Sequence, residues 1–239
     1  MNISILLAGG IGKRLGAGKP KQFVEILGKP MILYAMEIYE KSSLIDALEV
    51  VCVKEYINYV WQLAKENNIT KLKWVTEGGA NCQESTKNGI FALEGQVNDE
   101  DMLFVNMSSS LFVSEEILTD SYYVAQKYGS AFACSPCVYN NAETEDGISS
   151  KKINFKEKNR TLNMPWTSSF RKLDNLYHIA FEKGLEVGNA SYMPTLFLAL
   201  GEPIFFSKDD GLNKIHIQTH ADLEIAEAII EYRQKRGLL

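Results

Sequence analysis

The sequence is poor in the residue types that mark several classes of protein. Its 239 residues include only six prolines and four cysteines, and 46% of the residues are hydrophobic while 23% are charged. This balance excludes collagen-like, fibrous and disordered chains, and the length suits one large domain with a proper core. No apolar run approaches the roughly 20 residues that span a bilayer, so no membrane partner is expected.

Positively charged residues are fewer than negatively charged ones. The formal net charge is −5, which argues against a general role in binding nucleic acid. Residues 1–7 lack both the basic region and the long apolar region of a signal peptide, and they have the pattern of a first strand. We therefore expect a cytoplasmic protein.

Cysteine and histidine are too few and too scattered to indicate a metal or redox centre. Cys134 and Cys137 have the Cys-x-x-Cys spacing, but no histidine lies at a spacing that would complete a zinc site. A thioredoxin-type motif lies between a strand and a helix, whereas this pair closes an apolar strand and precedes a polar loop. We interpret these cysteines as structural.

Strand and helix signals alternate along the first half of the chain. This alternation predicts an α/β, Rossmann-like fold: one domain over 1–239, with a mostly parallel mixed sheet and helices on both faces. Strands are expected at residues 2–7, 48–53, 72–75, 102–105 and 130–134, and helices at 30–40, 55–67, 83–93 and 114–128. Ligands in such sheets bind beyond the carboxyl ends of the strands.

The pattern changes over residues 138–165, which are polar and rich in turn-forming residues. Residues 152–156 alternate like one exposed strand, so we expect a protruding β-arm, with Ile153, Phe155 and Leu162 as apolar anchors. Beyond the arm, helices are expected at residues 170–183, 194–200 and 221–235, and short strands at 203–206 and 214–217.

A glycine-rich basic loop directly follows the first strand. Gly9, Gly10 and Gly12 let backbone amides approach an anion closely. Arg14, Lys19 and Lys21 add positive charge to a chain that is acidic overall. The loop is neither a Walker A motif nor a dinucleotide fingerprint. We interpret it as a site for a polyphosphate, with an ordinary flexible basic loop as the alternative.

A second candidate segment runs over residues 77–89. Gly78 and Gly79 precede a helix that opens at about Gln83 to Ser85, where free backbone amides can receive polar ligand atoms. An ordinary helix cap is the alternative.

These two segments resemble known enzymes. Residues 6–39, with Gly-x-Gly-x-Arg and Lys-Pro-Lys-Gln-Phe intact, resemble the N-terminal signature of the methylerythritol-phosphate and ribitol-phosphate cytidylyltransferases, a sugar-nucleotidyltransferase-like family. The resemblance implies transfer of CMP from CTP to a small phosphorylated alcohol, with release of pyrophosphate and with Arg14 and Lys21 as catalytic residues. It implies the following nucleotide-binding residues: Ala8, Gly9, Gly10, Gly12, Lys13, Lys19, Gly78, Gly79, Ser85 and Ser108.

Other landmarks of that family are altered. Met107 stands where the family has a metal-binding aspartate, Ser110 where it has an arginine, and Cys82 replaces the arginine of the second segment. A thioether is a poor ligand for Mg²⁺, which requires oxygen. For Mg²⁺ or another divalent cation we expect triphosphate oxygens together with Asp209 or Asp210.

The acceptor side departs further. The resemblance implies Arg160, Lys214 and His216 as acceptor-binding residues, His216 replacing a lysine, and a homodimer formed through the arm. Two alternatives stay open. One is a nucleotidyltransferase with a different nucleotide or a phosphonate-like acceptor, and the other is a catalytically silent nucleotide-binding protein on the same fold.

Overall fold

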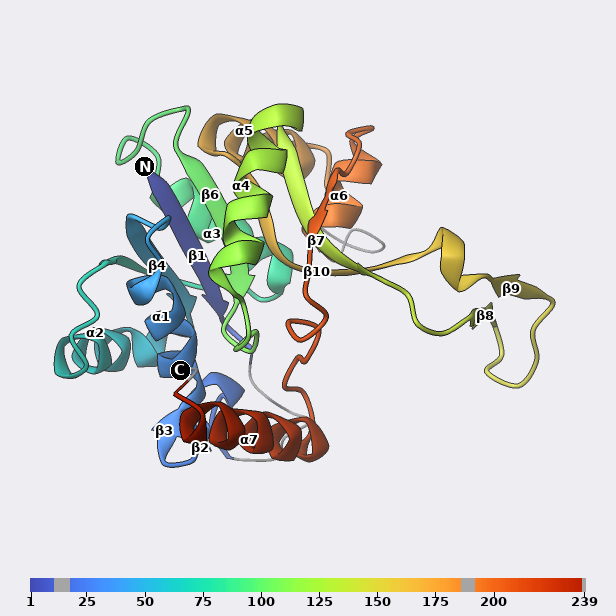
Figure 1. Ribbon diagram of the computed structural model, residues 1–239. Helices are drawn as coiled ribbons and strands as arrows, with labels where there is room; N and C mark the ends of the chain where they lie inside the picture. The colour runs from blue at the N-terminus through green and yellow to red at the C-terminus, as the bar shows by residue number, and fades with distance from the viewer. Residues whose placement is uncertain (11–17, 186–191, 238–239) are drawn as a thin grey trace.

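A seven-stranded sheet forms the centre of the molecule (Figure 1). The computed structural model describes residues 1–10, 18–185 and 192–237. The sheet order is β11-β7-β10-β6-β1-β4-β5, and only β10 runs antiparallel to its neighbours. The strands are β1 (Asn2–Ala8), β4 (Ala47–Cys52), β5 (Leu72–Glu77), β6 (Met102–Met107), β7 (Ser130–Pro136), β10 (Arg160–Ser169) and β11 (Phe206–Lys208). The predicted mostly parallel mixed sheet is confirmed.

Helices cover both faces of this sheet. Residues of α1, α2 and α4 pack into one apolar cluster, and residues of α3, α5 and α6 pack into a second cluster on the opposite face. The helices are α1 (Met31–Lys41), α2 (Ile57–Glu66), α3 (Cys82–Ala92), α4 (Glu115–Tyr128), α5 (Phe170–Glu182), α6 (Met193–Ala199) and α7 (His220–Lys235). Strand β1 serves both faces, because Leu6 and Ala8 join the first cluster while Ile5 and Leu7 join the second. The predicted α/β fold is confirmed.

Short-range signals place several helix ends. The Ser114 hydroxyl accepts a hydrogen bond from the Ile117 amide at 3.3 Å and caps α4, as its sequence position indicates. Gly129, with φ of 85°, ends the same helix in the left-handed region. No helix among the described residues is long and apolar enough to cross a membrane.

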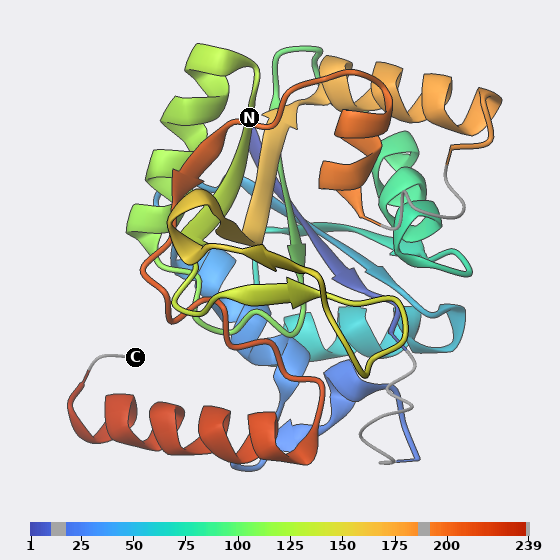
Figure 2. The ribbon, with the colours of Figure 1, turned by 90° about the vertical axis from the view of Figure 1, so that its right-hand side faces the viewer.

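The arm is a separate two-stranded hairpin that projects from the sheet (Figures 1 and 2). It consists of β8 (Asn141–Glu143) and β9 (Lys152–Asn154), followed by the short helix η4 (Lys156–Lys158). The predicted end of the arm at residue 165 is wrong, because β10 returns to the main sheet from Arg160 onward. The middle of β10 is buried between β6 and β7 although much of it is polar. Hydrogen bonds make that burial possible: Thr167 Oγ1 lies 2.8 Å from Ser121 Oγ, and Ser168 donates to the Gly129 carbonyl at 2.6 Å.

The C-terminal strands also differ from the prediction. The strand expected at residues 203–206 forms instead at β11, where Phe206 pairs with Phe132. The strand expected at residues 214–217 is wrong, since only His216 pairs there, in an isolated bridge to Ser110. Helix α7 then lies across the end of the sheet toward which β1 points, beside the β2–β3 hairpin of Glu25–Ile26 and Lys29–Pro30 (Figures 1 and 2).

The Cys-x-x-Cys pair belongs to the β7 region. Cys134 is buried in the strand, and burial raises the pKa of its thiol. Cys137 Sγ lies 3.4 Å from the Thr161 hydroxyl. All four thiols of the chain are free.

Candidate active site

The glycine-rich loop is anchored where it leaves and where it rejoins the core. Gln22 is fully buried, and its side-chain amide donates to the carbonyl of Ala8, the last residue of β1. Phe23 stacks on Tyr56, with ring centroids 4.1 Å apart and planes 11° apart. The Lys-Pro-Lys-Gln-Phe element is therefore held against the carboxyl end of β1. Gly12, Lys13 and Arg14 lie outside the described residues.

The second glycine segment meets the first at Ser85. A methyl group on Gly9 would lie 3.3 Å from Ser85 Oγ, and one on Gly78 would lie 3.1 Å from the same atom. The Gly79 amide donates to that hydroxyl at 3.0 Å. Only glycines let the two backbones come this close to one side chain. The structure thus brings together Gly9, Gly78, Gly79 and Ser85.

Helix α3 begins at this junction. Asn81 caps it by accepting a hydrogen bond from the Glu84 amide at 2.9 Å, so its first turn points toward Gly78 and Gly79. Cys82, which takes the place of the family's arginine, packs against the second apolar cluster. Burial raises the pKa of its thiol to about 11, so this position is neutral.

Lys21 lies on the other side of the loop. A methyl group on Gly10 would lie 3.4 Å from Lys21 Cε. The Lys21 ammonium donates to Ser109 Oγ and to the Ile217 carbonyl, each at 3.3 Å. Strand β6 is followed by Ser108 and then by Ser109. The Ser108 amide donates a hydrogen bond to the Leu7 carbonyl at 3.0 Å. Two segments far away in the chain, at Ser109 and at Ile217, therefore meet at Lys21.

His216 completes this network. Its Nε2 lies 2.8 Å from Ser110 Oγ, and its Nδ1 lies 3.4 Å from Ser109 Oγ. Burial, followed by the charge of Lys21, lowers the pKa of His216 to about 4, although Asp222 acts in the opposite direction. His216 is therefore a neutral hydrogen-bonding group near neutral pH. A hydrolase-like Ser-His pair is disfavoured, because Ser110 is buried and the imidazole is a weak base.

The Met107 side chain has no oxygen atom that could bind a metal ion where the family has a carboxylate. It ends β6 opposite Leu7 and packs against the second apolar cluster. Ser108, beside it, is buried. Among the described residues, Met107 and Ser108 therefore supply no carboxylate oxygen for a hard cation at this position.

Asp209 and Asp210 lie elsewhere. They follow β11 at the sheet edge, with β7, β10 and β6 between that strand and β1. Asp209 accepts from the Asn163 side chain and from the Gly211 amide, and Asp210 accepts from the Leu212 amide at 2.9 Å. The structure does not bring either carboxylate to Lys21. Among the described residues, the one metal-like group of His, Cys, Asp or Glu comprises Glu94, Asp174 and His178.

The other predicted contact residues are exposed. Arg160 begins β10 at the base of the arm and donates to the Asn159 carbonyl at 3.0 Å. Lys214 is exposed in the turn before His216. Lys19 is exposed and lies 4.0 Å from Glu25. Among the described residues, the partners of Arg160 and Lys19 lie outside the Lys21 network.

Two contributors were missed from the sequence. Gln22 stands inside the Lys-Pro-Lys-Gln-Phe element, so its motif was a usable signal. Ser109 is one of three adjacent serines, and nothing in the sequence distinguishes it from its neighbours.

Comparisons with known proteins identify a family and several relatives of this chain. Residues 2–138 match the 2-C-methyl-D-erythritol 4-phosphate cytidylyltransferase family. The chain is 29% identical over 238 residues to a ribitol-5-phosphate cytidylyltransferase of Lacticaseibacillus paracasei, covering 98% of this chain and 100% of that protein. It is also 29% identical over 236 residues to a 2-C-methyl-D-erythritol 4-phosphate cytidylyltransferase of Clostridium acetobutylicum, covering 97% and 98%.

Solved structures show the same fold. The 4-diphosphocytidyl-2C-methyl-D-erythritol synthase of Anaerococcus prevotii superposes with a TM-score of 0.78 at 16% identity, covering 97% of this chain and 98% of that one. The 2-C-methyl-D-erythritol 4-phosphate cytidylyltransferase of Thermus thermophilus gives a TM-score of 0.73 at 21% identity, covering 97% and 100%. The family match spans more than half of the chain and includes both glycine segments, so this protein is a nucleotidyltransferase that belongs to the 2-C-methyl-D-erythritol 4-phosphate cytidylyltransferase family.

Proposed function

We propose that this enzyme transfers CMP from CTP to a small phosphorylated polyol and releases pyrophosphate. The observation that carries the proposal is the meeting of two glycine segments at Ser85, with Lys21 on the other side of Gly10. The acceptor class is supported by the relatives, which are named for ribitol 5-phosphate and for 2-C-methyl-D-erythritol 4-phosphate. The two relatives are equally identical to this chain and cover 98% and 97% of it, so both acceptors are tested side by side.

The reaction requires positioning and neutralisation of charge more than acid–base chemistry. An acceptor phosphate oxygen attacks the α-phosphorus of CTP, and the bond from that phosphorus to the bridging oxygen breaks. Pyrophosphate leaves with the electron pair. A phosphate monoester is largely ionised near neutral pH, so no general base is needed. The backbone near Gly9, Gly10, Gly78 and Gly79 cradles the nucleotide, while Lys21 stabilises the negative charge that develops.

Magnesium enters this proposal as part of the substrate. Mg²⁺ needs few protein carboxylates when a triphosphate and water supply the other oxygens. This agrees with Met107 packing against the core and with Asp209 and Asp210 lying at the sheet edge. We assign Arg14 a catalytic role beside Lys21 through the family motif alone.

The acceptor side is proposed to involve the arm of a second copy. Tyr139, Ile148, Ile153 and Phe155 are all more than half exposed on an element that contributes nothing to either apolar cluster. Exposed apolar side chains on a projecting hairpin favour burial against another subunit. That burial would carry Arg160 toward an acceptor pocket, with Lys214 and His216 on the chain that binds CTP. Light scattering should report a dimer at micromolar protein, and a monomer unchanged by removal of residues 138–159 would contradict this.

The decisive assay is pyrophosphate release. We expect release from CTP with ribitol 5-phosphate or 2-C-methyl-D-erythritol 4-phosphate, and little release when ATP or GTP replaces CTP. Calorimetric titration with the three nucleotides separates binding from turnover. CTP binding without pyrophosphate release for any polyol phosphate would favour the catalytically silent alternative. Equal or absent binding of all three nucleotides would contradict the nucleotide site itself.

A further inference from the structure

Three potential metal ligands meet where the end of α3 lies against α5 (Figure 2). Asp174 and His178 stand one turn apart on α5, and Glu94 follows the end of α3. Their ligand atoms all lie within 4.8 Å of one another. Helix α3 has 11 residues, so this cluster lies roughly 16 Å along the helix axis from the turn that meets Gly78 and Gly79. The cluster is therefore separate from the nucleotide cradle.

The distances between these atoms suit one shared metal ion. His178 Nε2 lies 3.2 Å from Glu94 Oε1 and 3.6 Å from Asp174 Oδ1. In a tetrahedral site with ligand atoms about 2.0–2.1 Å from Zn²⁺, neighbouring ligand atoms are roughly 3.3–3.4 Å apart. Two of the three spacings therefore come close to those of a zinc site, and the third is no longer than 4.8 Å.

Local contacts hold two of the ligands in place. The His178 ring stacks on the Phe91 ring, with centroids 4.2 Å apart and planes 17° apart. The Glu94 amide donates to the Phe91 carbonyl at 3.1 Å, which fixes the backbone of Glu94 at the end of α3. Phe91 itself packs against the second apolar cluster. The three side chains are thus carried by two packed helices, and such support keeps the geometry of a metal site fixed.

Asp174 has an oxygen atom that no protein donor satisfies. Its Oδ1 is buried, and among the described residues no hydrogen-bond donor reaches it. Burial raises the pKa of this carboxyl; His178 lowers it, while the charges of Glu94 and Asp99 raise it further. Arg171, the cation one turn before Asp174, is paired with Asp99 at 3.5 Å. A single imidazole therefore faces two carboxylates, and negative charge is in excess at this point.

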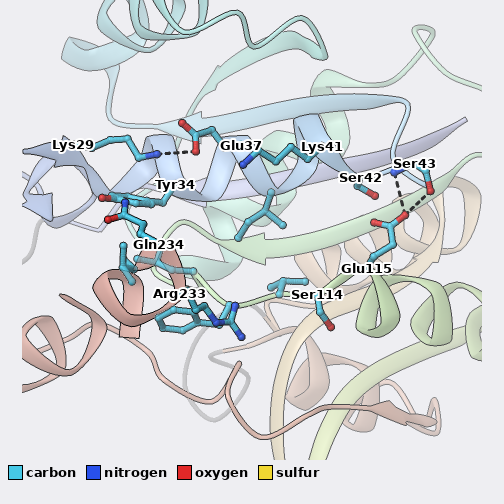
Figure 3. A pocket seen from close by; sticks show the side chains of 15 residues that line it. Lys29, Tyr34, Glu37, Lys41, Ser42, Ser43, Ser114, Glu115, Arg233 and Gln234 are labelled. Atoms are coloured by element: carbon cyan, nitrogen blue, oxygen red, sulfur yellow. Dashed lines mark hydrogen bonds and ion pairs between the residues drawn. The ribbon is translucent and has the colours of Figure 1, made fainter. Parts of the chain in front are cut away.

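Other carboxylates on the surface show the contrast. In the groove between α1 and α7, Glu37 Oε2 pairs with Lys29 Nζ at 2.7 Å (Figure 3). Glu115 Oε1 accepts hydrogen bonds from the Ser43 amide at 3.0 Å and from the Ser43 hydroxyl at 2.7 Å. Protein groups therefore stabilise both of these carboxylates, whereas Asp174 Oδ1 has no such donor.

We propose that Glu94, Asp174 and His178 bind a divalent transition-metal ion, and Zn²⁺ is the ion to test first. His178 supplies Nε2, each carboxylate supplies one oxygen, and water fills the remaining position, because about half of the Glu94 and His178 side chains faces solvent. An imidazole nitrogen favours Zn²⁺ over Mg²⁺ and Ca²⁺, which prefer oxygen ligands. The ion joins the end of α3 to α5 and is distinct from the Mg²⁺ that accompanies CTP.

Calorimetric titration of the whole protein tests this site without any nucleotide. The protein is first freed of metal with a chelator and then dialysed. We expect one Zn²⁺ per chain to bind with a micromolar Kd, and Mg²⁺ and Ca²⁺ to bind roughly a hundredfold more weakly. Zn²⁺ at about a hundred times its Kd should raise the midpoint of thermal unfolding by about 5–10 °C, because only the folded chain brings the three ligands together.

Two variants and two matched controls decide the assignment. His178→Ala should weaken Zn²⁺ binding at least about tenfold, because loss of even a group that orients a ligand costs that much. Asp174→Asn keeps the shape of the side chain and should weaken binding in the same direction. His220→Ala removes an exposed histidine from α7, and Cys137→Ser removes a thiol of the Cys-x-x-Cys pair. Both controls should keep the parent affinity within about twofold, since they lie outside the cluster.

Four results would overturn the proposal. They are equal weakening by His178→Ala and His220→Ala, weakening by Cys137→Ser alone, Mg²⁺ binding as tight as Zn²⁺ binding, and no saturation below roughly 1 mM Zn²⁺. The first two would place the bound Zn²⁺ elsewhere in the chain. The last two would mean that the three side chains form an ordinary ion-pair cluster.

Discussion

His216 links the stability of this fold to pH, and glutamine in its place should remove that link. Burial and then the Lys21 charge hold the pKa of folded His216 at about 4. Histidine in an unfolded chain titrates near about pH 6.5. Between these values the unfolded chain takes up a proton that the folded chain does not, so stability falls as the pH falls. The contribution of His216 is fully present above about pH 6.5 and is lost by about pH 4.

The size of the effect follows from the gap between these two values. A gap of roughly 2.5 pH units corresponds to an upper limit of about 3 kcal/mol in the free energy of unfolding. Burial raises the pKa of Asp222, but hydrogen bonds from Gln218 and Thr219 outweigh burial and lower it. Asp222 therefore stays largely ionised where His216 titrates.

Urea unfolding from about pH 7 to about pH 4 measures this dependence. Glutamine keeps groups that can bond to Ser109 and Ser110 but cannot become charged, so the His216→Gln variant should lose less stability on acidification than the parent protein. Exposed His220 provides the control, and His220→Gln should follow the parent curve. Parallel curves for the parent and His216→Gln would refute the argument that His216 is held neutral by its surroundings.

Three further substitutions test the site and the core. Lys21→Ala should lower kcat on the order of a hundredfold while changing CTP affinity much less, because its charge acts mainly as the α-phosphate becomes more anionic. Steady-state kinetics measure kcat and calorimetry measures CTP affinity. An unchanged kcat would contradict this role of Lys21. Gly79→Ala would place a methyl group 2.2 Å from Glu84 Cβ, so the segment must move and CTP affinity should fall roughly tenfold. If calorimetry gives the variant the same CTP affinity as the parent protein, the argument from steric crowding is wrong. Gly89→Ala would place a methyl group 2.8 Å from Val51 Cγ2, and we expect urea unfolding to show a net loss of about 1 kcal/mol after the gain in helix propensity. If Gly89→Ala is instead more stable than the parent protein, the core around Val51 can rearrange to accept the methyl group.

The alternation of apolar strands and amphipathic helices was enough to predict the α/β fold. A strand such as β1, with an apolar run from Ile5 to Ala8, must be covered on both faces, and residues on its two sides join two different clusters. The caps at Ser114 and Gly129 are local effects, so they too could be predicted from neighbouring residues. The glycine segments could also be recognised from the sequence, since close backbone approach depends on the absence of a side chain.

Strand β10 could not be recognised in this way. Thr167 and Ser168 look like loop residues, and they are buried only because Ser121 and the Gly129 carbonyl supply their hydrogen bonds. Those partners lie about forty residues away in the chain, where no local pattern reveals them.

The surroundings of Lys21 also combine features that the sequence shows with features that only the fold decides. The sequence by itself identified the motif that contains Lys21 and Gln22, while the hydrogen bond by which buried Gln22 holds this motif to β1 was seen only in the structure. Only the tertiary structure decided what Lys21 contacts, since Ser109 and the Ile217 carbonyl come from segments 88 and 196 residues away. The neutral state of His216 was likewise decided in three dimensions. A histidine's charge at neutral pH depends on its burial and on the cations beside it, and neither is specified by its place in the chain.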